Sequence, residues 1–253
     1  MKNCINWKAF FILLGLSLIS VGCVFPYILS LQGEVIKQIG QPITLIFFAQ
    51  IFQSLILFSV TIFLGLFLAK KVNFKLPLIE AILEKGDYKK ILKNILGKSI
   101  IIGAVAAILI YIVDILFTIL GAAISTHQNY APAWQKLLAA LYGGTTEEIL
   151  MRLFLMTFFV WLIMKIFKQK QPTKTNIIIS IFLAAIIFGL GHLPLTASLT
   201  TLNPLIISRA IVLNGIGGII FGWLFWKKGL ESAMIAHFTA DIFLLTLLPL
   251  LFK

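Results

Sequence analysis

Ionisable side chains stand inside stretches of this sequence that are otherwise apolar. Within a membrane such residues are costly and rare, so each of them indicates a functional site. Carboxylates that accompany histidines suit a general base that activates water, and they also suit the ligands of a catalytic metal ion. The residues concerned are Asp114, Glu147, Glu148, Asp241, His192, His237, Arg152 and Arg209.

Two adjacent glutamates and an arginine lie in the segment Gly143–Arg152. On a helix, Glu148 and Arg152 are four residues apart and share a face, where they can pair. Glu147 is turned away from that face by about 100°. We therefore predict that Glu148 and Arg152 support the structure and that Glu147 is the general base. A buried network that only joins helices is the alternative for this segment.

His237 and Asp241 are also four residues apart, so both side chains point into the same space. Asp241 is predicted to orient His237 through one of its ring nitrogens. His192 follows two glycines, Gly189 and Gly191, which allow a neighbouring backbone to approach closely. Taken alone, His192 is better explained as a hydrogen-bonded interior histidine.

The elements that position these residues must be membrane-spanning helices. Hydrophobic residues make up 60% of the 253 residues and charged residues only 12%, against about 25% charged in soluble domains. A helix needs about 20 mostly apolar residues to cross the bilayer. We expect an all-α, polytopic transmembrane bundle of about seven to eight spans, the eighth being a re-entrant element. The seven spans predicted are Ala9–Leu31, Pro42–Ala69, Ser99–Ile124, Lys136–Phe167, Ile177–Leu193, Leu205–Trp226 and Ala233–Phe252.

The lysines indicate the orientation of these spans. If the spans alternate, every lysine except Lys37, Lys136 and Lys253 falls on one side, which is the cytoplasmic side by the positive-inside rule. This predicts a multi-pass protein, in the cell membrane, with a cytoplasmic N-terminus. The same bias accounts for the net charge of +12 without a nucleic-acid partner.

Two further segments and one ion pair are predicted. Leu76–Lys98 carries apolar residues at helical spacing between lysines and is expected to form one or two short helices on the cytoplasmic face, broken at Gly86–Asp87. A substrate-docking platform is the alternative for it. The first span is expected to be retained rather than cleaved. Asp114 and Arg209 are candidates for a pair, and His127 is expected to be solvated.

Three motifs resemble those of the CPBP intramembrane protease family, which comprises CAAX prenyl endopeptidases and bacteriocin-processing or Abi-type proteins. They are EExxxR at Glu147–Arg152, FxxxH at Phe188–His192 and HxxxD at His237–Asp241. The resemblance covers roughly residues 136–245 and implies an endopeptidase that hydrolyses peptide bonds in or beside the membrane. It divides the chain into N-terminal transmembrane helices with a basic connector (1–133) and a catalytic core (134–253).

The resemblance also implies roles for individual residues. Glu147 would activate a water molecule held by His192, while His237 and Asp241 would stabilise the oxyanion. Glu148 and Arg152 would support the site. Family members often have asparagine at the position of Asp241, and an ionised carboxylate cannot donate a hydrogen bond. Asp241 is therefore either protonated or orients a charged His237.

A catalytic zinc ion is a further alternative, bound through Glu147, His192, His237 and Asp241. The sequence contains neither an HExxH nor a GxSxG motif, so the zincin layout and a serine nucleophile are not expected. At 1.5 Å per residue, His237 lies roughly 6–10 Å past its cytoplasmic loop and His192 roughly 20–25 Å from that side. The two can meet only if helices tilt or the fifth span begins further into the cytoplasm.

Two functions of other classes compete with the protease. One is a non-catalytic membrane partner, such as an immunity or sensor protein, and the other is a small proton-coupled transporter. For the protease, peptides or proteins are the expected substrates and the lipid bilayer is the expected surrounding. A prenylated CAAX-type peptide and a bacteriocin leader are both compatible with the motifs.

Overall fold

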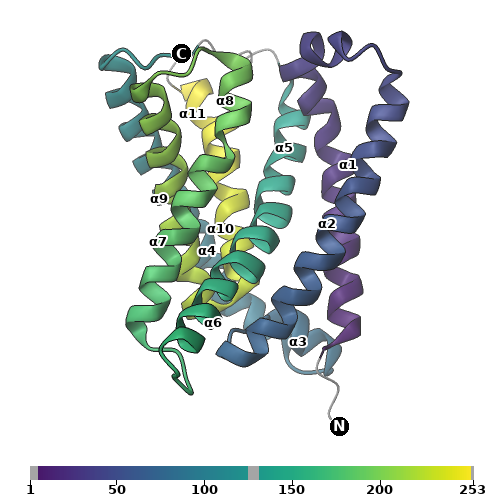
Figure 1. The fold of residues 1–253 in the computed structure, drawn as a ribbon, viewed down its shortest axis with the longest axis vertical. Coiled ribbons are helices and arrows are strands. Elements are labelled where there is room, and N and C mark those ends of the chain that lie inside the picture. Colours follow the sequence, from purple (N-terminus) through teal and green to yellow (C-terminus); the bar gives the residue numbers. More distant parts are fainter. Residues whose placement is uncertain (1–4, 125–130, 252–253) are drawn as a thin grey trace.

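The computed structural model describes residues 5–124 and 131–251, which form helices and their connections without any strand (Figure 1). Seven helical stretches are long and apolar enough to cross a membrane, as the composition predicts. This confirms the polytopic all-α bundle. The stretches are Trp7–Gln38 (α1), Ile43–Val72 (α2), Tyr88–Ile119 (α4), Ala133–Ile166, Lys174–Leu199, Pro204–Lys228 (α9) and Leu230–Leu251.

Three of the seven stretches consist of more than one element. Ala133–Ile166 comprises α5 (Ala133–Tyr142), two π-helical segments, η2 (Gly143–Glu147) and η3 (Ile149–Met156), and α6 (Thr157–Ile166). Lys174–Leu199 comprises α7 (Lys174–Gly191) and α8 (Leu193–Leu199). Leu230–Leu251 comprises α10 (Leu230–Ile242), the π-helical η4 (Phe243–Leu247) and α11 (Leu248–Leu251). A π-helical segment inside a long helix often accompanies a functional site.

Polar residues at the helix starts explain where four of the long helices begin. Asn6, Asp87, Thr173 and Asn203 each accept a hydrogen bond, through the side chain, from the backbone N–H three residues later. Such N-caps satisfy donors that the first turn of a helix leaves unpaired. The caps extend α1, α4, α7 and α9 beyond the apolar stretches by which the spans were predicted.

The basic connector differs in part from its prediction. A short helix, α3 (Pro77–Leu83), is present, and the break at Gly86–Asp87 occurs where expected. The second short helix is absent because the chain from Tyr88 onward already belongs to α4. No proline or glycine pair interrupts the sequence between the lysine-rich turns and the apolar span, so one helix continues through both.

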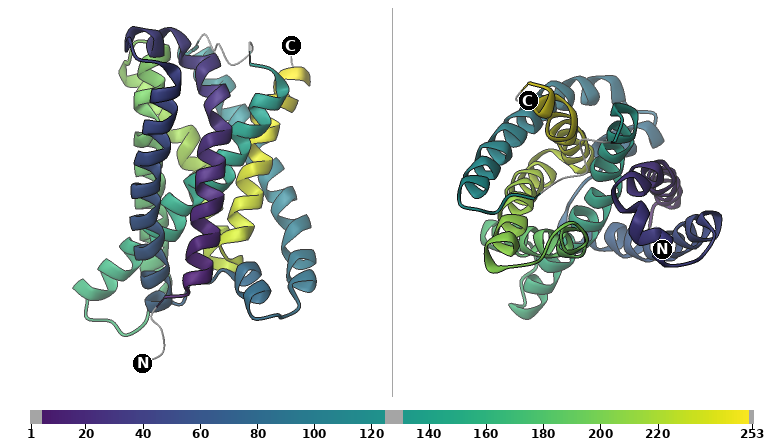
Figure 2. Two further views of the ribbon diagram at one scale, coloured as in Figure 1. Left: turned by 90° about the vertical axis from the view of Figure 1, so that its right-hand side faces the viewer. Right: turned by 90° about the horizontal axis from the view of Figure 1, so that it is seen from above.

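The helices form two groups that meet at the α5–α6 stretch (Figures 1 and 2). On one side α7 packs on α9, and α10 packs on α4 and α9; on the other α1 packs on α2 and α5, and α2 packs on η3 and α6. Gly189 allows the close approach of α7 and α9, as predicted, whereas a Cβ atom at Gly191 would meet nothing within 4 Å. A Cβ atom at Gly189 would lie 2.6 Å from Ile211 Cα, and one at Gly218 would lie 2.8 Å from Ala185 Cα.

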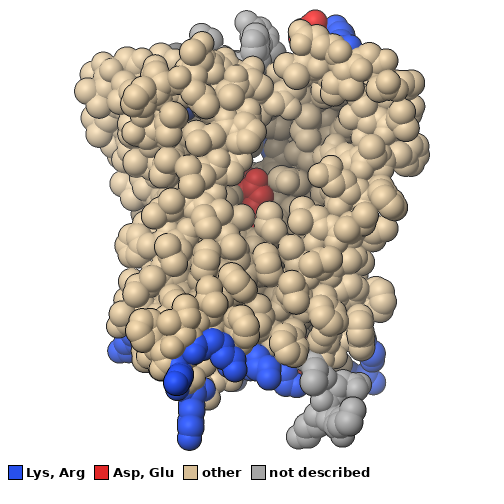
Figure 3. Space-filling model, viewed as in Figure 1, with Lys and Arg blue, Asp and Glu red and all other residues tan. Residues whose placement is uncertain are grey.

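The surface agrees with a protein embedded in lipid. Large apolar side chains are exposed along the long helices, for example Ile101, Val105 and Ile112 on α4 and Phe48 and Phe52 on α2. Basic side chains gather mainly at one end of the molecule, the lower end in Figure 3, while both arginines lie within helices, in η3 and α9. The molecule is therefore an integral, multi-pass membrane protein. The predicted loop residue His127 lies outside the described residues.

Candidate active site

Glu148 joins two other predicted site residues at the centre of the bundle. Its Oε1 lies 2.7 Å from Nδ1 of His237, within hydrogen-bond distance, and 3.1 Å from Nη1 of Arg152. The Glu148 side chain is completely buried and that of Arg152 almost completely. The predicted pair between Glu148 and Arg152 is therefore present, and it continues to His237.

Arg152 is held by groups from two other helices, α7 and α9. Its Nη2 donates at 3.5 Å to the backbone carbonyls of Gly217 and Gly218 on α9. The guanidinium lies 5.1 Å from the ring centroid of Phe188 and 5.6 Å from that of Phe221, at cation–π distance. A buried charge needs such partners, because an unpaired one would cost several kcal/mol.

His237 turns its second ring nitrogen toward the other two acidic residues. Nε2 lies 3.6 Å from Asp241 Oδ2 and 3.8 Å from Glu147 Oε2. Both distances exceed that of a direct hydrogen bond. The expected orienting contact from Asp241 is thus supplied by Glu148 instead, since the short contact of the ring is the one at Nδ1. Phe221 stacks on the ring at 4.7 Å and limits its rotation.

Accessibility separates the two adjacent glutamates. The side chains of Glu147 and Asp241 are 23% and 22% exposed, whereas Glu148 has no exposed surface. Figure 3 shows acidic atoms at the bottom of a hollow, midway along the face of the molecule. A small cavity of about 80 Å³ also reaches His237 and Asp241, next to Asn214 on α9. Glu147 and Asp241 are therefore the carboxylates that an incoming molecule can meet.

Two glycines that carried no role in the sequence-based prediction make this geometry possible. A Cβ atom at Gly143 would lie 3.2 Å from His237 Nε2 and would overlap Asp241 Oδ2. At Gly144 it would lie 2.8 Å from the backbone oxygen of Met234. Both are buried where η2 packs on α10. Their position just before the glutamate pair, in an apolar stretch, was the signal available in the sequence.

His192 lies apart from this cluster. Its Nδ1 is 2.8 Å from the backbone oxygen of Phe188, and its ring meets the Phe188 ring edge-on at 4.7 Å. Phe188 in turn meets His237 at 6.0 Å. The structure thus brings Glu147, His237 and Asp241 together, and it connects His192 to them only through the ring of Phe188.

The predicted depth difference between the histidines is largely removed. Phe188 is near the end of α7 and His237 is in the first half of the stretch Leu230–Leu251, yet their rings are neighbours. Helix α7 begins at Lys174, three residues before the predicted start, and the α6–α7 connection reaches below the start of α10 in Figure 1. The two helices therefore enter the bundle at different levels.

The donors do not form a metal site in this arrangement. Within residues 5–124 and 131–251, no group of three or more His, Cys, Asp or Glu side chains has the spacing to hold a metal ion. His192 is the predicted ligand that stands away from the others. The residues present therefore do not fit a four-ligand zinc site as they stand.

The other predicted ion pair is present on a different part of the bundle. Arg209 Nε and Nη2 both lie 2.6 Å from Asp114 Oδ1, linking α9 to α4. The side chains are 17% and 31% exposed. The pair joins two helices that both pack on α10, the helix that carries His237.

Comparison with known proteins identifies the part of the chain that holds this cluster. Residues 129–243 match the family model described as type II CAAX prenyl endopeptidase Rce1-like. No curated protein and no solved structure matches the chain. The matched segment contains all three motifs, which confirms their resemblance to the CPBP family. Residues 129–243 are therefore similar to the Rce1-like type II CAAX prenyl endopeptidases.

Proposed function

We propose that the protein is an intramembrane endopeptidase whose general base is Glu147. The observation that carries the proposal is the contact between Glu148 and Nδ1 of His237, which leaves Nε2 turned toward Glu147 and Asp241. Nε2 of His237 then faces two partly exposed carboxylates, while Glu148, which holds the ring, and its partner Arg152 are buried. This division into reachable and buried groups favours chemistry over a purely structural network.

Glu147 would accept a proton from a water molecule in the space between its carboxylate and His237. The oxygen of that water attacks the carbonyl carbon of the scissile peptide and forms a tetrahedral oxyanion. The protonated Glu147 then gives the proton to the leaving nitrogen as the carbon–nitrogen bond breaks. The products are a new carboxyl terminus and a new amine, so that one water is consumed for each bond cleaved.

The oxyanion needs a hydrogen-bond donor, and His237 is the group placed to supply one. Its Nδ1–H is directed to Glu148, so donation from Nε2 requires the imidazolium form of the ring. Asp241, at 3.6 Å from Nε2, would hold that ring in place or, when protonated, donate directly. We propose that His192 contacts the attacking water from α7, which requires a shift of its side chain past Phe188.

We propose that residues 134–253 carry the chemistry and that residues 1–133 provide walls of the site. Helices α1 and α2 pack against α5 and η3, and α4 packs against α10. The substrate would be a peptide at the membrane, and a prenylated CAAX-type peptide is the class that the family suggests. The protein would lie in the cell membrane. Its lysine-rich end and its N-terminus would face the cytoplasm.

A cleavage assay with defined metal content tests the proposal. Purified protein in lipid nanodiscs is given fluorogenic peptides with and without a prenylated CAAX end, with and without chelator. We expect cleavage by the wild type, loss of cleavage in Glu147→Gln and no effect of Glu34→Gln, a control at an exposed glutamate near the end of α1. Cleavage that the Glu147→Gln variant retains would contradict the proposal, and loss with chelator alone would favour the zinc alternative.

A further inference from the structure

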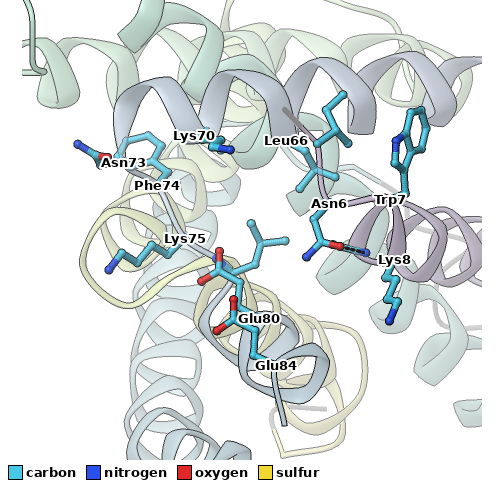
Figure 4. A pocket seen from close by; sticks show the side chains of 14 residues that line it. Asn6, Trp7, Lys8, Leu66, Lys70, Asn73, Phe74, Lys75, Glu80 and Glu84 are labelled. Atoms are coloured by element: carbon cyan, nitrogen blue, oxygen red, sulfur yellow. Dashed lines mark hydrogen bonds between the residues drawn. The ribbon is translucent and has the colours of Figure 1, made fainter. Parts of the chain in front are cut away.

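A second cavity lies at the lysine-rich end of the molecule, away from the candidate active site. It measures about 720 Å³, within the usual range of small-molecule sites. The start of α1, the end of α2 and the helix α3 enclose it (Figure 4). Because spans α1 and α2 have their ends here, the cavity is at the level where a bilayer has its headgroups.

Charged residues of both signs line this cavity. Glu80 of α3 and Glu84, which follows that helix, stand on one side, and Asn6 and Lys8 at the start of α1 stand on the other (Figure 4). Lys70, near the end of α2, also lines it. Lys8, Glu80 and Glu84 form no ion pair within the part of the chain that the structure describes. Opposite charges across a cavity, not neutralised by one another, suit a ligand that carries both.

An apolar groove adjoins the cavity at Trp7, which lines both. The groove measures about 310 Å³ and runs between α1 and α2, past Phe10, Val60 and Phe63. Val60 and Phe63 precede Lys70 by seven to ten residues, so they lie roughly 10–15 Å deeper along α2. Trp7 is half exposed, in the position that tryptophan favours at a membrane interface. A polar cavity at headgroup level and an apolar groove below it match the two parts of one lipid.

We propose that this site binds a phospholipid whose zwitterionic headgroup has a primary ammonium, of the phosphatidylethanolamine class. The phosphate would lie by Lys8, the ammonium would donate hydrogen bonds to Glu80 and Glu84, and one acyl chain would follow the groove. A trimethylated ammonium has no N–H to donate, and the headgroup of phosphatidylglycerol has no cation for the glutamates. The site is independent of the proposed protease function.

The first experiment measures lipid choice. Delipidated full-length protein in detergent is titrated with phosphatidylethanolamine, phosphatidylcholine and phosphatidylglycerol of the same acyl chains, and native mass spectrometry gives the bound fractions. We expect phosphatidylethanolamine to bind about tenfold more tightly than either of the others. The variant Glu80→Gln/Glu84→Gln should reduce this preference to about twofold or less, whereas Glu34→Gln, at the opposite end, should keep it. Equal binding of the three lipids by the wild type would overturn the proposal.

The second experiment separates a lipid from a soluble ligand with the same headgroup. Ser59→Trp fills the groove and should weaken binding of the intact lipid, while binding of glycerophosphoethanolamine stays unchanged. Intact lipid should also bind far more tightly than glycerophosphoethanolamine, because its acyl chain buries apolar area. If Ser59→Trp has no effect and the two ligands bind equally, the site is not a lipid site. Lys8→Glu serves as a third variant if the double glutamine protein does not fold, and it too should lose the lipid.

Discussion

Glu148 Oε1 and His237 Nδ1 lie 2.7 Å apart, and this contact links the two helices that carry the candidate chemistry. The same oxygen lies 3.1 Å from the Arg152 guanidinium, so one buried carboxylate serves both partners. Glu148 is therefore a positioning residue, whereas its neighbour Glu147 faces the accessible side. Two identical side chains at adjacent positions have different environments, and this difference is the basis of the first two predictions.

Glu147→Gln should abolish cleavage without unfolding the protein. Its carboxylate is partly exposed and makes no short contact with His237, so the amide is tolerated but cannot accept the proton of water. We expect kcat to fall by about 10²–10⁴-fold, the usual contribution of a general base. Peptide cleavage and thermal unfolding in detergent measure the two effects. A fall in the unfolding temperature as large as that of Glu148→Gln would contradict the assignment.

Glu148→Gln should lower stability as well as activity. It leaves the Arg152 charge without its counter-ion in a fully buried place, which costs about 3–5 kcal/mol. The double variant Glu148→Gln/Arg152→Met removes both charges and should be more stable than Glu148→Gln alone. Thermal unfolding of the wild type, Glu148→Gln, Arg152→Met and the double variant tests this. A double variant that is as unstable as the sum of its single changes would show that the two residues do not pair.

Gly143→Ala should impair catalysis by disturbing the contact between η2 and α10. The added methyl group would meet Asp241 and lie 3.2 Å from His237 Nε2, so these side chains must move. A displacement of about 1 Å at a reacting centre can lower the rate about 10²-fold. Gly15→Ala in α1 is the matched control, because no atom lies within 4 Å of its new methyl group. Equal activity of the two variants would argue against a site at this contact.

His192→Ala should reduce kcat by about tenfold, the loss of one hydrogen bond of about 1.4 kcal/mol in the transition state. This loss is smaller than that of Glu147→Gln because His192 is not part of the cluster around His237. Steady-state cleavage kinetics give kcat and KM separately. An effect on KM alone would place His192 in substrate binding, and not at the attacking water.

Asp114 and Arg209 should couple energetically without affecting cleavage directly. Their contact joins α4 to α9 and is partly exposed, so we expect a coupling energy of about 1–2 kcal/mol. A double-mutant cycle with Asp114→Asn and Arg209→Gln, followed by thermal unfolding, measures it. Additive effects of the two changes would mean that the pair adds no stability.

Composition and spacing alone were sufficient to predict much of this protein. Seven apolar stretches predicted seven spans, because the bilayer requires a minimum helix length that the sequence shows directly. Helical periodicity placed Glu148 with Arg152, and this pair is present. The three motifs indicated the family whose model matches residues 129–243.

Tertiary structure decided the relations between helices, which no periodicity within one helix contains. Gly143 and Gly144 allow η2 to pack closely on α10. As a result, the nearest carboxylate to the His237 ring is that of Glu148 and not that of Asp241. The helices α7 and α10 start at different heights in the bundle. For this reason the His192 ring contacts the ring of Phe188, and Phe188 in turn contacts His237. The lipid-sized cavity likewise depends on contacts between segments far apart in the chain, because side chains from different helices must pack in three dimensions.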